Sequence, residues 1–321
     1  MSVGRQKIRD HRGFLLTEIL ISLLTFIVIT AAILTTLKLS AEKITSFLDY
    51  RKATLRIAKA AALLKAPVFY CGFGMPLSSS VYKRAFGSQK FDPFRWEGPI
   101  SACKGPNSFA NSELRIAYAM PGTPRLSLRT VSEYSESLVR LDKFPPLGSI
   151  GESFAGCAFD IRNWVIFPSS FPPALPLRIT AASGKTLSVK NNFDSSFSIS
   201  KGDRIYHFRA MKIYCLNDRL YTKDFRSSGD QPRIEGIRDM RFDVDIGKRT
   251  ITVYLLVRGD HLYEKNMPIK NSDLWPDEYI GPWISKGSKY QQFAAKRVWR
   301  LPNCISEEIT DLEKTSIREH F

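Results

Sequence analysis

Glu18 is the residue whose type and position most directly imply chemistry. It follows the segment Gly13-Phe14-Leu15-Leu16-Thr17 and stands at the start of an uncharged apolar run from Ile19 to Leu37. In helical form that run spans nearly ~30 Å, about the hydrocarbon thickness of a bilayer. A carboxylate at the edge of a membrane costs free energy unless a partner compensates its charge. Glu18 is therefore predicted to bind a positively charged group.

The cysteines imply a second kind of chemistry, disulfide formation. They are Cys71, Cys103, Cys157, Cys215 and Cys304; none forms a CxxC pair, and the chain has only four histidines, so no zinc-site spacing is recognised. Wide spacing behind an export signal favours disulfides. The candidates are Cys71, Cys103, Cys157 and Cys215, with Cys71–Cys103 as the first expected pair because both flank a loop region containing Gly and Pro. Closing that loop contributes roughly 3–4 kcal/mol, and the odd number leaves one thiol free or paired between molecules.

Motifs that resemble catalytic sites are incomplete. The segment 181–186 (AASGKT) ends like a phosphate-binding loop, but Ile179 stands where the first glycine is required, so a turn between strands is expected. Asp243 and Asp245 share one face of a predicted strand and are interpreted as solvated rather than cation-binding. Because no carboxylate pair, catalytic triad or metal-ligand set stands out, the sequence predicts a protein that is not an enzyme and has no cofactor or metal.

The chain is strongly basic, with a formal net charge of +16 over 321 residues. Such a balance is compatible with nucleic acid, anionic lipid or another polyanion as partner, although a soluble surface with surplus Lys and Arg is the favoured explanation. The charges are scattered, which weakens the case for nucleic acid. Aromatic residues adjoin two basic groups, so the candidate polyanion contacts are Lys83, Arg84, Lys296, Arg297 and Arg300.

The first 66 residues predict a basic leader and one long helix. An ordinary signal peptide is the competing interpretation, but its apolar region is usually shorter and ends at a small-residue cleavage site. Here the helical pattern continues over 38–66 with a narrower apolar stripe, and Pro67 is expected to end it. The stripe consists of Ile44, Phe47, Leu48, Leu55, Leu63 and Leu64.

Beyond Pro67 the pattern changes to short β-type runs. Alternating residues over 240–257, with a turn at Gly247-Lys248, predict a hairpin with one buried face. A second hairpin is expected over 205–221, turning near Asn217-Asp218, and 298–301 is a candidate edge strand. A helix followed by antiparallel strands predicts the α+β class, a long N-terminal helix packed on an antiparallel sheet. The fold of 75–200 stays open.

A basic leader that ends in Gly13, followed by Phe14, by Glu18 at the fifth mature position and by an apolar helix, resembles the class III signal of type IV pilins and type II secretion pseudopilins. The resemblance implies that a prepilin peptidase cuts between Gly13 and Phe14 on the cytoplasmic side and methylates the new amine of Phe14. It also implies that Glu18 pairs with the N-terminal amine of a neighbouring subunit. Glycine before the cut lets an extended backbone enter a protease site without a Cβ clash.

Later segments are similar to the large minor pilins of the PilW-like group and to the pseudopilin J group. An aromatic-Gly-Cys segment after the helix and several short strand motifs carry this similarity: Phe69-Tyr70-Cys71-Gly72, Gly202-Asp203, Leu220-Tyr221, Ile234-Glu235-Gly236-Ile237 and Leu255-Leu256-Val257-Arg258. The resemblance implies a pilin-like fold in four parts. These are a cleaved leader (1–13), a transmembrane and filament-core helix (14–37), an amphipathic helix (38–66) and a β-rich domain (67–321).

The function expected from this resemblance is that of a minor pilin or pseudopilin, a structural subunit that initiates or caps a type IV pilus-like filament. Its partners would be the prepilin peptidase, other major and minor pilin-like subunits, the inner-membrane assembly platform and, before assembly, membrane lipid. The chain would cross the inner membrane once, with a cytoplasmic N-terminus and a periplasmic or extracellular β-rich domain. Two alternatives are a filament-tip module that captures DNA or another polyanion, and a minor pseudopilin of a type II secretion system.

Overall fold

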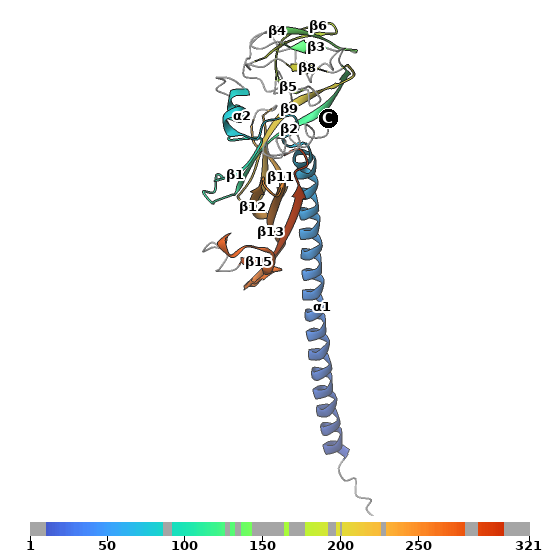
Figure 1. The fold of residues 1–321 in the computed structure, drawn as a ribbon. Helices are drawn as coiled ribbons and strands as arrows, with labels where there is room; N and C mark the ends of the chain where they lie inside the picture. Colours follow the sequence, from blue (N-terminus) through green and yellow to red (C-terminus); the bar gives the residue numbers. More distant parts are fainter. Residues whose placement is uncertain are drawn as a thin grey trace, which may run out of the picture. The chain divides into compact units, whose positions relative to one another are not determined.

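The computed structural model describes residues 11–85, 92–125, 129–131, 136–142, 164–166, 177–191, 197–199, 201–225, 229–279 and 288–304. The chain divides into two compact units, Met1–Arg51 and Lys52–Phe321, which are treated separately below as the first and second units. One helix, α1 (His11–Tyr70), contributes its N-terminal part to the first unit and its C-terminal part to the second (Figure 1).

In the first unit, α1 carries the predicted apolar run. Its large apolar side chains from Leu16 to Leu37 are 52–69% exposed. The hydroxyls of Thr25, Thr35 and Thr36 each donate to the carbonyl oxygen four residues earlier, at 2.8 Å, so they do not interrupt the apolar surface. The helix is long and apolar enough to cross a membrane. Because this surface would be costly in water, it requires lipid or protein around it.

In the second unit, the end of α1 packs through a stripe that agrees with the predicted one at Leu63 and Leu64 but differs from it elsewhere. Ala53, Ala60, Leu64 and Val68 are at most 2% exposed, whereas Leu55 of the predicted stripe is 55% exposed. Ile44, Phe47 and Leu48 are also exposed. Successive buried positions are seven, four and four residues apart, so they lie on one helix face, and alanine lets the helix approach the strands closely.

The expectation that Pro67 ends the helix was wrong by three residues, since α1 continues to Tyr70. A proline in the last turn removes one backbone hydrogen bond. Burial of Pro67 and Val68 in the second unit offsets that loss.

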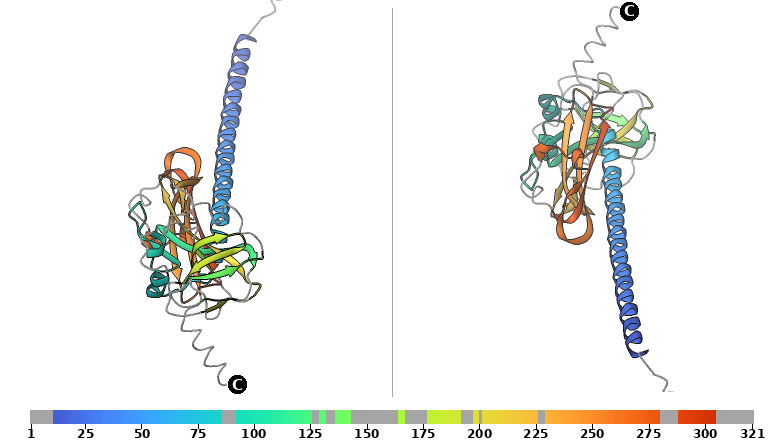
Figure 2. Two further views of the ribbon diagram at one scale, coloured as in Figure 1. Left: turned by 90° about the horizontal axis from the view of Figure 1, so that it is seen from above. Right: turned by 90° about the horizontal axis from the view of Figure 1, so that it is seen from below.

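Four strands form one sheet, in the order β12-β13-β15-β14. Their bounds are β12 (Ile237–Asp245), β13 (Thr250–Met267), β14 (Ile269–Lys270) and β15 (Ser288–Arg300). The hairpin predicted over 240–257 is confirmed, with Met240 opposite Leu255 and Phe242 opposite Val253. β15 is longer than the predicted edge strand over 298–301. It lies beside β13 and is flanked by β14 on its other side (Figure 2).

The larger sheet has nine strands, with β1-β2-β9-β5-β6-β7-β4 as its main path and β10 and β11 attached beside β9. Their bounds are β1 (Ile100–Cys103), β2 (Glu113–Arg125), β4 (Glu136–Arg140), β5 (Trp164–Ile166), β6 (Leu177–Ser183), β7 (Thr186–Lys190), β9 (Arg204–Leu216), β10 (Arg219–Asp224) and β11 (Gln231–Glu235). A separate pair consists of β3 (Arg129–Val131) and β8 (Phe197–Ile199).

Two turn predictions in the larger sheet are confirmed. The β9–β10 hairpin turns at Asn217 and Asp218, which both have positive φ, 50° and 58°, as a two-residue hairpin turn of the primed kind requires. The segment 181–186 forms the β6–β7 turn rather than a phosphate-binding loop, with Gly184 at φ 57°.

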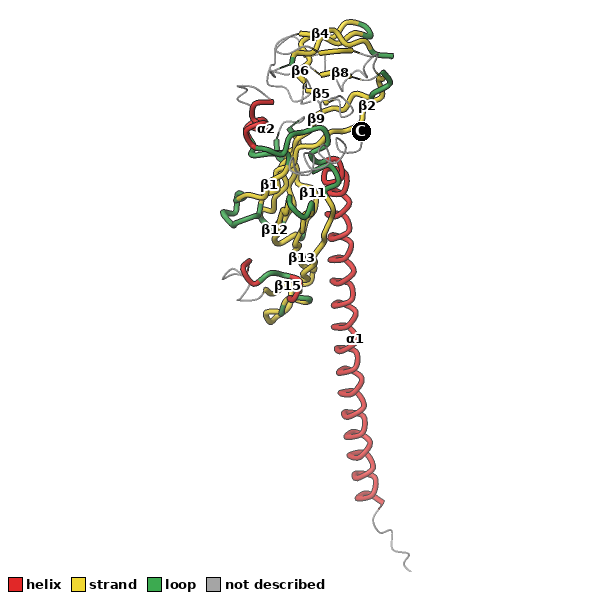
Figure 3. The backbone as a smooth tube through the Cα atoms, in the orientation of Figure 1, coloured by secondary structure: helices red, strands yellow, loops and turns green. Residues whose placement is uncertain are grey.

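The main core lies among the α1 end, the four-stranded sheet and one face of β2 and β9. The opposite face of β2 and β9 is covered by aromatic residues near α2 (Ser79–Ala85) and η1 (Asp92–Arg95). Among the described strands, every pairing is antiparallel except that of β14 with β15. A long N-terminal helix with a large antiparallel β region confirms the α+β class (Figure 3).

Candidate functional site

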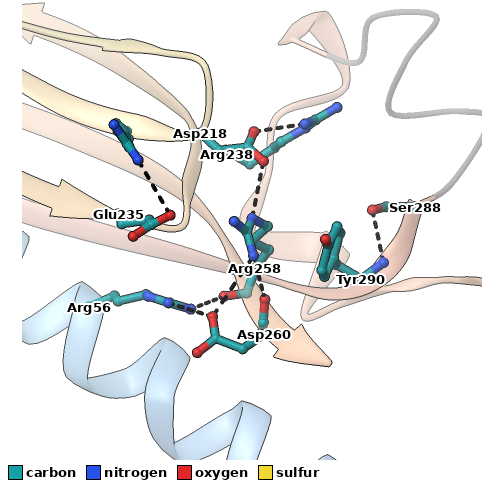
Figure 4. Close-up of polar contacts among 10 residues, drawn as sticks. Arg56, Asp218, Glu235, Arg238, Arg258, Asp260, Ser288 and Tyr290 are labelled. Atoms are coloured by element: carbon teal, nitrogen blue, oxygen red, sulfur yellow. Dashed lines mark hydrogen bonds and ion pairs between the residues drawn. The ribbon is translucent and has the colours of Figure 1, made fainter. Parts of the chain in front are cut away.

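The end of α1 is held in the second unit by a network of ion pairs. Asp260, on β13, accepts from two helix residues: Lys52 Nζ lies 2.7 Å from its Oδ2 and Arg56 Nη2 lies 2.6 Å from its Oδ1. Arg56 also donates to the carbonyl oxygen of Arg258 at 2.7 Å. Figure 4 shows the Arg56 guanidinium reaching from the helix to both β13 residues.

A second half of the network joins β13 to the β9–β10 turn. Arg258 Nε lies 3.0 Å from Asp218 Oδ2, and Arg238 Nη1 lies 2.7 Å from Asp218 Oδ1. The Arg258 guanidinium also stacks over the Tyr290 ring, 4.5 Å from its centroid. Helix, turn and sheet are thereby linked by one series of ion pairs that runs from Lys52 to Arg238. Figure 4 shows the part from Arg56 to Arg238.

Gly236, between β11 and β12, makes room for this network. Its φ is +83°, and a Cβ at that position would lie 2.5 Å from Arg56 Cζ. Its N–H donates to the Asp218 carbonyl at 2.7 Å, and its own carbonyl accepts from the Arg258 N–H at 2.9 Å. Only glycine combines this backbone conformation with so close an approach.

The electrostatics of Asp260 favour its charged form. Burial alone would raise the pKa of its carboxyl, but the hydrogen bonds from Lys52 and Arg56 outweigh burial and hold that pKa below its usual value. The network therefore contributes stability above about pH 4 and loses it as the pH falls through the folded-state pKa of Asp260. Because Asp260 is partly exposed, each ion pair contributes only modestly to stability. The main effect of the network is to fix the position of the α1 end against β13.

Replacing Gly236 by alanine is expected to displace Arg56 and to lower the free energy of unfolding by about 1–3 kcal/mol, because both the backbone and the guanidinium oppose a Cβ. Thermal unfolding of the full chain in detergent micelles measures the effect. Gly202→Ala is the matched control, since Gly202 has a similar φ of +93° but nothing within 4 Å of the added Cβ. Equal losses in the two variants would show that the Arg56 contact adds nothing.

A second charged group is deeply buried on β12. The side chains of Asp239 and Arg241 are 1% and 4% exposed, and Arg241 Nε and Nη2 lie 2.9 and 2.8 Å from Asp239 Oδ2. Arg241 Nη1 donates to the Ala110 carbonyl at 2.6 Å, and its guanidinium faces the rings of Phe109 and Tyr279. Burial raises the pKa of Asp239 despite the opposing effect of Arg241. The prediction of a hairpin with one buried face was therefore incomplete, because part of the second face is covered too.

The predicted processing and assembly residues all lie on α1. Gly13 and Phe14 fall within the helix, and the side chain of Phe14 is outside the described residues. Glu18 is exposed, so its carboxylate is accessible to a group on another molecule. The role of these three residues stays a prediction.

The expected disulfide between Cys71 and Cys103 is not formed, and the strand register keeps the two residues apart. Cys71 forms an isolated backbone β-bridge with Tyr118, whereas Cys103, on β1, pairs with Glu113. Tyr118 and Glu113 both lie on β2, five residues apart. Five residues along a strand correspond to ~17 Å, far beyond the ~7 Å between Cα atoms that a disulfide tolerates. Cys215 is a buried free thiol, and Cys157 lies outside the described residues.

The candidate polyanion contacts do not form one patch. Lys83 is on α2 and forms an ion pair with Glu97 at 2.6 Å, and the side chain of Arg84 is outside the described residues. Lys296, Arg297 and Arg300 are exposed on β15. Because successive side chains of a strand point to opposite faces, Arg297 faces away from the other two.

Neither the ion network nor the buried Asp239–Arg241 pair is predicted by the sequence. Arg56 and Asp260 are 204 residues apart in the sequence, and no local pattern links positions so distant. For Asp239 and Arg241 the alternation on β12 was recognised, but it cannot reveal that Tyr279 and the loop at Phe109 and Ala110 cover that face. No protein-family model, curated protein or solved structure significantly matches this chain.

Proposed function

We propose that this chain is a minor pilin-like subunit that initiates or caps a type IV pilus-like filament. The observation that carries the proposal is the segment from Gly13 to Glu18, which precedes an exposed apolar helix. Prepilin peptidase would cleave between Gly13 and Phe14 and methylate the new amine, and Glu18 would then receive the amine of a neighbouring subunit. At helical rise Glu18 lies about 6 Å from Phe14. The α-amine of Phe14 and the carboxylate of Glu18 would therefore lie at nearly the same depth, where each could pair with the opposite charge of an adjacent subunit.

The exposed apolar surface of the helix suits two environments in succession, first the bilayer and then the filament. In the bilayer, lipid would cover the apolar side chains of residues 14–37, with the N-terminus cytoplasmic and the second unit periplasmic. In a filament, the helices of neighbouring subunits would cover the same side chains. The surface area removed from water is comparable in both states, so transfer between them requires little change in hydrophobic free energy.

In this proposal the ion network transmits force from α1 to the rest of the second unit. Extraction of α1 from the membrane pulls on the end of the helix, which is held by Asp260 through Lys52 and Arg56 and by the buried face around Ala60 and Leu64. The second unit would therefore follow the helix as one body. Its partners would be other pilin-like subunits and the assembly platform.

Cells that lack this chain are expected to produce at least about tenfold fewer filaments, which corresponds to an increase of ~1.4 kcal/mol in the free energy of initiation. Filaments are counted by electron microscopy after complementation with the full chain. A variant with Lys296→Ala and Arg300→Ala should restore filaments fully, since neither residue is on α1. Unchanged filament numbers in cells without the chain would contradict an initiating role, and failure of the double variant alone would indicate that β15 contacts a partner.

A further inference from the structure

Two cysteines that are distant in sequence meet at the end of α1. Cys71 follows the last helical residue, and its N–H donates to the Val68 carbonyl at 3.3 Å. Cys304 follows β15, and its N–H donates to the Leu301 carbonyl at 3.2 Å. Between them, the Asn303 side-chain amide donates to the Phe69 carbonyl at 2.7 Å. Residues 301–304, directly after β15, are thus fixed against the helix end.

The two cysteines lie close together inside the main core. Cys71 and Cys304 are both 0% exposed and belong to the same hydrophobic cluster, and the Cys71 thiol donates to the Pro99 carbonyl at 3.5 Å. Cys304 Sγ also lies 3.9 Å from the Cys71 carbonyl oxygen. Gly72, at φ +72°, permits this approach, because a Cβ there would lie 2.9 Å from Cys304 Sγ.

We propose that Cys71 and Cys304 form a disulfide when the chain folds in an oxidising environment. One S–S bond forms, two thiol protons are released, and the two electrons reduce the S–S bond of a disulfide donor such as oxidised glutathione to two thiols. The bond joins the end of α1 to the segment directly after β15. It goes beyond the proposed function and does not depend on it, because it requires only folding in the presence of an oxidant.

The disulfide forms during folding rather than in the folded protein. Burial raises the pKa of the Cys71 thiol well above its usual value, and disulfide exchange requires an accessible thiolate. A donor therefore reacts with Cys71 or Cys304 while 301–304 is still detached from the helix end. This reaction leaves a mixed disulfide between the donor and the first cysteine. When the segment docks on the helix end, the second thiol attacks the mixed disulfide, forms the Cys71–Cys304 bond and releases the donor thiol.

Refolding of the full chain in detergent micelles tests the proposal. The protein is refolded with a mixture of oxidised and reduced glutathione, remaining thiols are alkylated in denaturant, and the protein is digested with trypsin without reduction. We expect a linked pair of peptides, 66–83 with 301–314, which separates on reduction. Alkylation of both Cys71 and Cys304 in the refolded protein would overturn the proposal, as would a linkage of either one to another cysteine.

Two matched variants and a second measurement keep the test independent of refolding yield. Cys103→Ser, which removes a partly exposed thiol, should leave the linked pair intact, and Cys304→Ser should abolish it. In protein extracted from membranes with its thiols blocked at lysis, the same linked peptides are expected. A reductant should then lower the Tm of that protein by about 5–15 °C, because the bond closes a very long loop, but not that of Cys304→Ser. No linked peptides in the protein refolded with glutathione, or equal Tm values of the linked protein with and without reductant, would overturn the proposal. Linked peptides in the refolded protein but none in protein from membranes would instead contradict the periplasmic location of the second unit.

Discussion

The variant Glu18→Ala is expected to enter the membrane normally but to be depleted at least about tenfold from sheared filaments. Tenfold corresponds to ~1.4 kcal/mol, less than the loss usually measured when one partner of a desolvated charge pair is removed. Insertion should persist because the substitution removes a charge from the edge of the apolar run and leaves the run from Ile19 to Leu37 unchanged. Immunodetection in the membrane and filament fractions gives the ratio.

Two companion variants separate charge from shape at this position. Glu18→Gln retains the size of the side chain and should be depleted almost as strongly, because only the carboxylate carries the charge. Glu42→Ala removes another exposed acid of α1 and should assemble normally. Normal incorporation of Glu18→Ala would remove this residue from the assembly mechanism.

The variant Arg241→Ala is expected to lose about 3–5 kcal/mol of unfolding free energy, because it leaves the Asp239 carboxylate buried without its partner. It also removes a cation from between the rings of Phe109 and Tyr279. Thermal unfolding of the full chain in micelles, followed by tryptophan fluorescence, measures the loss, which corresponds to a fall in Tm of roughly 6–20 °C.

Arg238→Ala is the control for this substitution. Arg238 lies on the same strand and also pairs with an aspartate, but its side chain is 38% exposed. Its removal should cost at most about 1 kcal/mol. Similar stabilities of the two variants would mean that burial of the Asp239–Arg241 pair does not determine its contribution.

The elements that could be predicted from the sequence are those specified by local patterns. The alternation over 240–257 predicted the β12–β13 hairpin, and Asn217-Asp218 predicted the turn between β9 and β10. The long uncharged run predicted an apolar helix. In each of these cases the neighbours in space are also neighbours in sequence, so side-chain period and turn chemistry are sufficient.

What could not be predicted depends on contacts between distant segments. Ala53 and Ala60 are buried where α1 packs on the strands. Alanine adds little to a hydrophobic pattern, so the pattern instead predicts a buried stripe through the larger residues Ile44, Phe47 and Leu55. The disulfide between Cys71 and Cys103 was expected from the composition of the loop between them. In the structure the backbone partners of the two cysteines on β2 are five residues apart, which separates the cysteines. Spacing along the chain contains no information about either contact.

The position and modification of the mature N-terminus decide whether this chain is processed as a pilin-like subunit. The protein is purified from membranes of cells that contain a prepilin peptidase, and its N-terminal peptide is analysed by mass spectrometry. The account predicts a chain that begins at Phe14 and carries one additional methyl group on its α-amine, and a Gly13→Val variant that keeps residues 1–13. A wild-type chain that retains its leader, or that is cut after the apolar run instead, would contradict it.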